Sequence, residues 1–346
     1  MTVPAAVIVL AAGQGTRMKS SLPKVVHPVA GRSMIGHALK ACEGLNPAHL
    51  VAVVRHQREL VEAEIKRISP TAIVADQDEI PGTGRAVQCG LEELERQVGQ
   101  IHGTVVVTYG DVPMLSTETL KALVDAHIEQ ANVVTVLTSR VDDPTGYGRI
   151  IRDAGGRVTA IVEQRDATEE QALINEINAG IYAFDADYLR ESLANVGTNN
   201  DQGEVYLTDV LAAAAPAGKR AGAMELLDEW QAQGCNDRVQ LAELGAEFNR
   251  RICEKHMREG VSIIDPESTW IGVDVEIGND TTIWPGTVLR GATVIGSECE
   301  IGPSVTLDTA IVGNRAVIHN ACVFNVSVAP DTMVTPFSVI GQSSRD

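Results

Sequence analysis

Positive charge is scarce in this sequence. Its 346 residues include 28 lysines and arginines against 46 aspartates and glutamates, which gives a formal net charge of −18. Nucleic acids are bound by clustered cations that neutralise phosphates, so this balance excludes a broad nucleic-acid surface. We therefore expect no nucleic-acid partner, and we expect any phosphorylated ligand to be held by a few local groups and a metal ion.

Long apolar runs and paired cysteines are also missing. No run approaches the roughly 18 apolar residues of a membrane span, and the run at residues 5–10 lacks the basic leader and length of a signal peptide. These features predict a cytoplasmic protein that does not engage a membrane. The six cysteines are scattered without a C-x-x-C pair, which argues against disulfides and a zinc site and favours buried free thiols.

The first two thirds of the chain alternate between two kinds of pattern. Short β-branched runs occur at residues 5–10, 50–55, 71–75, 104–111 and 133–139, and helical patterns occur at 34–42, 60–68, 85–98 and 118–128. Near-continuous apolar strands separated by helices predict an α/β fold with a mostly parallel sheet covered on both faces. Ligands of such sheets bind outside the carboxyl ends of the strands.

The last third has a six-residue period. After one long helical pattern, aliphatic residues expected to face inward recur every six residues at Ile271, Ile277, Ile283, Leu289, Ile295, Ile301 and Leu307. The register then shifts twice, first to Val312, Ile318 and Phe324 and then to Val328, Val334 and Ile340. This pattern predicts a parallel β-helix of about four coils. The expected organisation is an α/β domain at 1–236, a linker helix at 237–262 and a β-helix at 263–346.

A glycine-rich segment follows the first strand. Gly13 and Gly15 let backbone N–H groups approach an anion, and Arg17 and Lys24 add positive charge. The segment is neither a Walker loop nor a full G-x-G-x-x-G fingerprint, and a bare glycine-rich turn can also be purely structural. The two cations favour a triphosphate site.

These residues resemble a known signature. The sequence L-A-A-G-Q-G-T-R-M at residues 10–18, followed by L-P-K at 22–24, resembles the nucleotide-diphospho-sugar pyrophosphorylases, and among them the N-acetylglucosamine-1-phosphate uridyltransferase part of the bifunctional bacterial enzymes. Further matching motifs lie at 82–84, 109–113, 145–149, 161–163, 178–180 and 236–238. The resemblance implies a Rossmann-like transferase domain followed by a short left-handed β-helix of hexapeptide repeats.

The resemblance also implies a metal site. Asp111 follows an apolar strand and so reaches the carboxyl edge of the sheet, although by itself it could be an ordinary turn or capping carboxylate. In the family, the Asp at this position and an Asn from a later loop bind Mg²⁺. The resemblance therefore implies that Asp111 and Asn236 bind Mg²⁺ in this protein. One carboxylate, one amide oxygen and substrate phosphates suffice for this ion.

Substrate-binding residues follow from the same motifs. Nucleotide binding is implied for Leu10, Ala11, Ala12, Gly13, Gly15, Lys24, Gln77, Gly82 and Thr83, and sugar binding for Tyr109, Gly148, Glu163 and Asn178. Two departures bear on specificity. Relatives commonly carry Gln-Leu or Pro-Leu where this chain has Ile80-Pro81, and Thr or Ser where it has Ala179, so one polar contact to the base and one to the sugar are expected to be absent.

The implied reaction joins UTP to N-acetylglucosamine 1-phosphate and releases pyrophosphate, for cell-wall precursor synthesis. No protein nucleophile is needed, and the expected catalytic residues Arg17, Lys24 and Asp111 align and neutralise phosphates. The alternatives are a pyrophosphorylase for glucose 1-phosphate or dTTP, and a non-catalytic regulatory or scaffold homologue. No position matches the family's acetyltransferase residues, so acetyl transfer is not expected, and the β-helix predicts a homotrimer.

Overall fold

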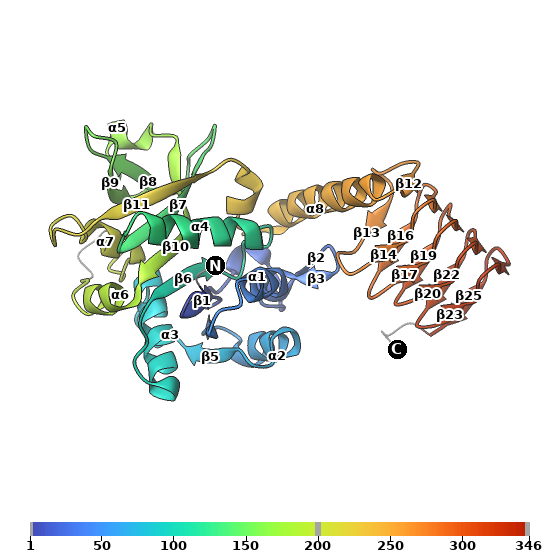
Figure 1. Cartoon of the computed structure of the whole chain (residues 1–346), viewed down its shortest axis with the longest axis horizontal. Coiled ribbons are helices and arrows are strands. Elements are labelled where there is room, and N and C mark those ends of the chain that lie inside the picture. The colour runs from blue at the N-terminus through green and yellow to red at the C-terminus, as the bar shows by residue number, and fades with distance from the viewer. Residues whose placement is uncertain (1–2, 198–201, 343–346) are drawn as a thin grey trace. The chain divides into compact units, whose positions relative to one another are not determined.

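The computed structural model describes residues 3–197 and 202–342, which form two compact units (Figure 1). The first unit contains the chain up to His27 and from Ser33 to Arg238, and the second contains Pro28–Arg32 and the chain from Val239 onward. No sequence pattern predicted that the short segment Pro28–Arg32 would belong with the second unit.

The first unit is built on one mixed sheet. Its strands are β1 (Ala6–Leu10), β4 (His49–Val54), β5 (Ile73–Asp76), β6 (Thr104–Tyr109), β7 (Val134–Arg140), β8 (Arg149–Arg152), β9 (Val158–Val162), β10 (Glu176–Asp185) and β11 (Ala221–Leu226). They are ordered β11-β7-β10-β6-β1-β4-β5, with β8 and β9 attached beside β10. The pairs β1–β4, β1–β6, β4–β5 and β7–β11 are parallel, whereas β10 runs antiparallel to β6 and β7. The predicted, mostly parallel α/β sheet is confirmed.

Helices cover this sheet. They are α1 (Met34–Glu43), α2 (Arg58–Ile68), α3 (Thr83–Val98), α4 (Thr117–Glu129), α5 (Glu169–Ala172), α6 (Ala186–Leu193) and α7 (Leu207–Ala212), with short 3-10 turns at Thr16–Met18, Lys24–Val26 and Glu229–Ala232. Side-chain caps fix the starts of α1 and α4, where Ser33 accepts from Gly36 N and Ser116 accepts from Thr119 N. The sequence predicted the first four helices but not α5, α6 or α7.

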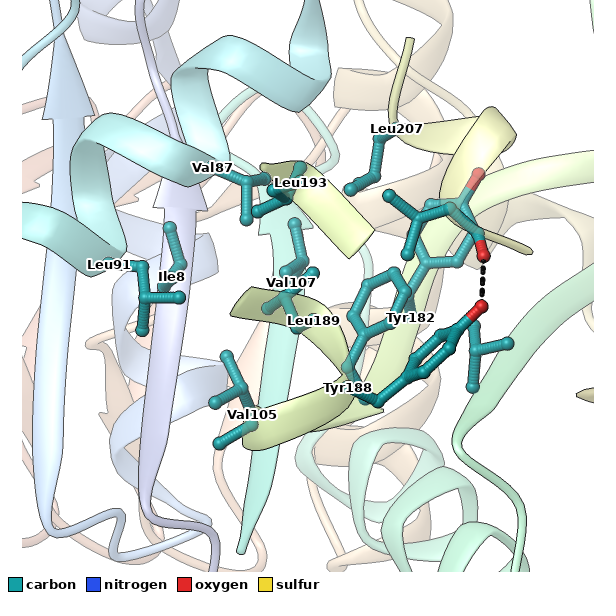
Figure 2. Close-up of a cluster of buried hydrophobic side chains, with 14 of the residues drawn as sticks. Ile8, Val87, Leu91, Val105, Val107, Tyr182, Tyr188, Leu189, Leu193 and Leu207 are labelled. Carbon is teal, nitrogen blue, oxygen red and sulfur yellow. Dashed lines mark hydrogen bonds between the residues drawn. The ribbon is translucent and has the colours of Figure 1, made fainter. Parts of the chain in front are cut away.

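Two hydrophobic cores lie on opposite faces of the sheet, because successive strand residues point to opposite sides. Along β1, Ile8 belongs to one core and Val9 to the other. Figure 2 shows the first core, in which residues of β1, β6 and β10 pack against α3, α6 and α7. The Tyr188 hydroxyl enters this core and donates to the carbonyl of Val210 at 2.7 Å. Both cores hold the carboxyl ends of β1, β4 and β6 in fixed positions.

The second unit contains the left-handed β-helix. Its short strands β12 to β25, between Ser262 and Gly341, form parallel sheets of five, five and four strands. One of these sheets has an aliphatic residue at the same register position of each strand. These residues are Ile271, Leu289, Leu307, Val323 and Ile340. The expectation that Phe324 points inward is wrong: Val323 is fully buried, and Phe324 is only partly buried. The coils after Leu307 contain fewer residues than the earlier ones. The buried residue that follows Ile318 is therefore Val323, five positions on, and not Phe324, six positions on.

Helix α8 (Arg238–Arg258) docks on the β-helix through a polar side chain. The buried Asn249 donates from Nδ2 to the carbonyl of Thr269 at 2.7 Å and accepts from Ile271 N at 3.0 Å. Val239, in the first turn of this helix, is 67% exposed. The segment Pro28–Arg32 also contacts the β-helix within the second unit. Ala30 O accepts a hydrogen bond from Val273 N at 2.9 Å, and Arg32 forms an ion pair with Asp274.

Two sequence features have simple structural counterparts. All six cysteines are free thiols in the structure, five of them buried and Cys322 partly buried. None of the described helices combines the length and the apolar character needed to cross a membrane.

Candidate active site

A cleft of about 360 Å³ opens at the carboxyl ends of β1, β4, β5 and β6. It is lined by the glycine-rich segment from Leu10 to Gln14, by Lys24, Val25, Arg55 and His56, by Gln77 and residues 81–83, and by Ala86, Tyr109, Asp111 and Glu204. This is the sheet edge where a parallel α/β fold binds its ligands. Ten of the predicted site residues line this cleft: Leu10, Ala11, Ala12, Gly13, Lys24, Gln77, Gly82, Thr83, Tyr109 and Asp111.

The glycine-rich segment presents backbone donors to the cleft. None of the backbone N–H groups of residues 12–15 donates to another described residue. A Cβ on Gly13 would meet nothing within 4 Å, so this side of the segment is open to a ligand. Gly15 serves packing instead: its φ is +65°, and a Cβ there would lie 2.5 Å from Lys24 Cβ. The absence of a side chain at Gly15 lets Lys24 pack directly against the glycine-rich segment.

Four polar side chains from distant parts of the chain meet beside this segment. Lys24 Nζ forms an ion pair with Asp111 Oδ2 and donates to Asn236 Oδ1 at 3.3 Å. Arg17 Nη2 also donates to Asn236 Oδ1, at 2.9 Å. The side chains of Lys24 and Asp111 are 12% and 19% exposed, so their charges are partly shielded from water. The predicted catalytic and metal-binding residues therefore form one cluster, although Arg17 and Asn236 do not line the cleft itself.

The loop before α8 brings Asn236 to this cluster. Cys235 N donates to the carbonyl of Asp111 at 3.0 Å, which ties the loop to the end of β6. At the other side of the loop, Arg238 Nε donates to the carbonyl of Met18 at 3.1 Å. The Cys235 side chain is buried beneath Asp111, and burial raises the pKa of its thiol to about 11. Cys235 is thus a neutral packing residue under the cluster.

Asp111 and Asn236 fit a magnesium site by the chemistry of their oxygen donors. The carboxylate of Asp111 and the amide oxygen of Asn236 contact the same atom, Lys24 Nζ, and so face one point. Among the described residues no group of three or more His, Cys, Asp and Glu side chains could form a complete metal cage. Magnesium commonly binds to one or two protein oxygens and completes its shell with water and phosphates.

The expected base-binding residues form one wall of the cleft. Gln77 Nε2 donates to the carbonyls of Ile80 at 3.0 Å and Gly82 at 3.2 Å, so its amide holds this loop closed on itself. Gly82 has a φ of +117°, and a Cβ there would lie 2.3 Å from Val205 O. Only glycine fits this approach, and Gly84 N donates to the same carbonyl at 2.8 Å.

Tyr109 connects this wall to the expected sugar pocket. Its ring lies against Gly180, where a Cβ would be 2.6 Å from Tyr109 Cε2, and its hydroxyl is hydrogen-bonded to Thr83. Burial raises the pKa of Tyr109, and the carboxylates of Glu163 and Asp111 raise it further. The phenol therefore stays neutral between the carboxylates of Asp111 and Glu163.

The other expected sugar-binding residues lie next to one another, outside the residues that line the cleft. Asn178 N donates to the carbonyl of Gly148 at 2.8 Å, and a Cβ on Gly148 would lie 3.4 Å from both carboxylate oxygens of Glu163. Burial raises the pKa of Glu163, and the neighbouring Asp166, Asp209 and Glu204 raise it as well. Ala179 packs into the core on the opposite face of the sheet from Tyr182, so its missing hydroxyl is not a gap in this pocket.

Sequence reasoning missed a buried cation behind this pocket. Arg149 is 1% exposed, and its guanidinium donates to the carbonyl of Tyr147, to Gln164 Oε1 at 2.7 Å and to the carbonyl of Ala172 at 3.3 Å. Gln164 Oε1 also accepts from Gly146 N at 3.0 Å. Arg149 thus fixes residues 146–148 from behind. Its signal in the sequence was only its place at the end of the motif at 145–149.

Arg55 and His56 were also missed. They follow β4 directly and line the cleft, and neither received a role from the sequence. Their position could have identified them, because both directly follow a buried strand and so lie at the sheet edge where ligands bind.

The fold is that of an α/β protein whose cleft lies at the carboxyl ends of its strands, where such folds bind ligands. The protein-family model for nucleotidyl transferases matches residues 6–238, and the model for bacterial transferase hexapeptide repeats matches residues 274–309. The chain belongs to the nucleotidyl transferase family.

Individual relatives are similar over most of this chain. It is 57% identical over 281 residues to the bifunctional protein GlmU of Kineococcus radiotolerans, covering 81% of this chain and 56% of that protein. It is 55% identical over 282 residues to the protein of the same name from Pseudarthrobacter chlorophenolicus, covering 82% and 57%. The chain therefore spans little more than half the length of these relatives.

A solved structure supports the fold. The crystal structure of apo UDP-glucose pyrophosphorylase aligns with a TM-score of 0.57 and 18% sequence identity, covering 72% of this chain and 99% of that one. At this identity the likeness concerns the fold alone.

Proposed function

We propose that this protein transfers a uridylyl group from UTP to N-acetylglucosamine 1-phosphate, releasing pyrophosphate and forming UDP-N-acetylglucosamine for cell-wall precursor synthesis. The observation that carries the proposal is the meeting of Lys24, Asp111, Asn236 and Arg17 beside the open glycine-rich segment. The similarity to proteins named GlmU and the motifs shared with sugar-nucleotide uridyltransferases support the same reaction.

The chain's own groups handle charge. Backbone N–H groups of residues 12–15 bind the triphosphate, while Lys24 and Arg17 neutralise the charge that develops as a sugar phosphate oxygen attacks the α-phosphorus. The new P–O bond forms as the bond to the β-phosphate oxygen breaks, and pyrophosphate leaves. No side-chain nucleophile is required, because the sugar phosphate supplies its own oxygen.

Asp111 and Asn236 would hold the Mg²⁺ ion proposed as cofactor. When bound, such an ion neutralises phosphate charge and orients the reacting groups.

The remaining residues select the substrates. Gln77, Gly82 and Thr83 form the wall proposed to bind uracil, and Gly148, Glu163 and Asn178 form the pocket proposed to bind the sugar. The buried and acidic surroundings of Glu163 suit a neutral sugar better than an anionic one, because like charges repel.

The decisive experiment measures pyrophosphate release with a panel of substrates. We expect Mg²⁺-dependent release with UTP and N-acetylglucosamine 1-phosphate that exceeds release with glucose 1-phosphate or dTTP. A preference for another pair would favour a different pyrophosphorylase, and no release with any pair would favour a regulatory or scaffold role. The presence of Arg17, Lys24 and Asp111 in one cluster argues for catalysis.

Acetyl transfer is a separate question. The expectation that this chain lacks it is not confirmed, because the relatives are named bifunctional and the chain carries hexapeptide repeats. An assay with acetyl-coenzyme A and glucosamine 1-phosphate decides it: release of free thiol would show the second activity.

Assembly and location remain proposals. A homotrimer through the β-helix is supported by the hexapeptide repeats and by the outward-facing apolar residues Val294 and Ile311, which pair on one sheet and are 39% and 56% exposed. Light scattering of the purified protein tests it. A cytoplasmic location stays a prediction.

A further inference from the structure

The cleft contains a cation that the proposed reaction has not used. Of the cationic residues Lys24 and Arg55 in its lining, Lys24 is paired with Asp111. Arg55 Nη2 donates to a neutral partner, the carbonyl of Glu79, at 3.3 Å, and no carboxylate of the described residues forms an ion pair with it. Its guanidinium therefore keeps donors for a ligand.

The order of the strands fixes where these donors lie. Strand β4 is between β1 and β5 in the sheet, with Leu10 opposite Val53 and Val54 opposite Asp76. Arg55 directly follows the last residue of β4, so it stands between the glycine-rich segment that follows β1 and Gln77, which follows β5. Under the proposed function, the phosphates bind on the first side and the base on the second.

The loop that Arg55 contacts is the base-binding loop itself. Glu79 belongs to residues 77–82, which Gln77 closes through the carbonyls of Ile80 and Gly82. In this loop the chain carries Ile80-Pro81, and Ile80 is 45% exposed and apolar, so its side chain cannot bond to a polar edge. A neighbouring guanidinium can supply the missing contact.

We propose that Arg55 is a further nucleotide-binding residue, which donates to the carbonyl oxygen at position 4 of uracil and so selects uracil over cytosine. The inference rests on the proposed function. Arginine is a donor only, so it favours the carbonyl at position 4 of uracil over the amino group at the same position of cytosine. Thymine carries the same carbonyl, and Arg55 therefore does not separate UTP from dTTP.

The test combines titration calorimetry and pyrophosphate release on the full chain, with Arg55→Leu and Arg55→Lys. Arg55→Leu is expected to weaken UTP binding about tenfold or more and to shrink the preference for UTP over CTP by a similar factor, since a bond to a charged donor is lost. Arg55→Lys should recover part of the affinity. The matched control is Arg96→Leu, which removes an exposed arginine of α3 that pairs with Glu93 outside the cleft and should change neither value.

The outcomes separate the two proposals. Unchanged UTP affinity in Arg55→Leu, with normal binding by the wild type, overturns the role of Arg55 alone. Equal loss of UTP and CTP binding, together with weaker binding of pyrophosphate alone, assigns Arg55 to the phosphates and also overturns it. A wild-type protein that binds no UTP overturns the proposed function and this inference together.

Discussion

The cluster of Arg17, Lys24, Asp111 and Asn236, proposed to bind phosphates, and the group around Glu163, proposed to bind the sugar, carry opposite local charge. Around Asn236, two cations, Arg17 and Lys24, meet one carboxylate, Asp111. Around Glu163 the neighbours that shift its pKa are all carboxylates, Asp166, Asp209 and Glu204. Both regions lie in the first unit and share Tyr109 as a neighbour, since Asp111 and Glu163 both raise its pKa.

The difference teaches what each region can bind. A region with surplus positive charge stabilises phosphates and the charge that develops during their transfer, so its residues should govern turnover. A region of partly buried carboxylates and amides holds neutral hydroxyl and amide groups through hydrogen bonds, so its residues should govern affinity. Variants of the two regions should therefore separate turnover from the Michaelis constant for the sugar phosphate.

The largest effect is expected at Asp111. Asp111→Ala removes the carboxylate proposed to hold Mg²⁺ and should lower turnover about 10³-fold or more, because a metal ion at this place would supply several kcal/mol of charge stabilisation. Pyrophosphate release measured against Mg²⁺ concentration checks this, with circular dichroism to confirm folding. Asp125→Ala, an exposed residue of α4, is the matched control. Near-normal activity of Asp111→Ala would contradict the metal assignment.

Lys24 should come next. Lys24→Ala leaves Asp111 in place but removes the charge aimed at the phosphates, and turnover should fall about 10²–10³-fold, as for loss of one transition-state donor. Steady-state kinetics decide between two roles. A fall in turnover places Lys24 in the transition state, whereas a change confined to the Michaelis constant for UTP would show ground-state binding only. Lys40→Ala, on the exposed part of α1, should have no effect.

The regular patterns of the sequence predicted much of this architecture. β-branched runs marked β1, β4, β5, β6 and β7, and the six-residue period marked the β-helix, because each repeats a local rule many times. The antiparallel β10 was not found, since it contains Gly180, shifts register between Asn178 and Tyr182, and pairs with strands far away in sequence. Phe324 was misplaced because one spacing of five residues broke the period.

The site was predictable only where motifs carried it. Asp111 and Lys24 could be chosen because their motifs are distinctive, but their contact with each other depends on how β1 and β6 pair. Arg55 reaches the cleft because β4 lies between β1 and β5, and no local pattern states that order. Arg149 was overlooked because arginine is rarely fully buried, so a buried role is the last one assigned to it.

A smaller effect, confined to the sugar side, is expected at Arg149. Arg149→Met removes the bonds that hold residues 146–148, and the Michaelis constant for the sugar phosphate should rise about tenfold while that for UTP stays nearly constant. Arg149→Lys should recover part of the loss. Arg152→Met is the matched control, because Arg152 lies on the same strand but pairs with Glu176. Equal changes for both substrates would mean that Arg149 only stabilises the fold.

The smallest effect on catalysis is expected at Glu163, and it comes with a distinct pH signature. Glu163→Gln keeps the shape and a hydrogen-bonding group, so the Michaelis constant for the sugar phosphate should rise only about 2- to 10-fold. The raised pKa of Glu163 means that the folded protein holds its proton more tightly than the unfolded chain. Ionisation of this carboxyl therefore costs stability as the pH rises through the folded pKa.

Glutamine cannot ionise, so Glu163→Gln should be more stable than the wild type near pH 7. The difference should vanish below the ordinary glutamate value of 4.5, where the carboxyl is protonated in both states. Urea unfolding at several pH values measures this difference in stability. The ratio of activities with N-acetylglucosamine 1-phosphate and glucose 1-phosphate tests the proposed sugar-binding role of Glu163 independently. A variant that is less stable near pH 7, or a difference that does not depend on pH, would show that Glu163 is stabilised by a cation after all and that the two regions do not differ in charge.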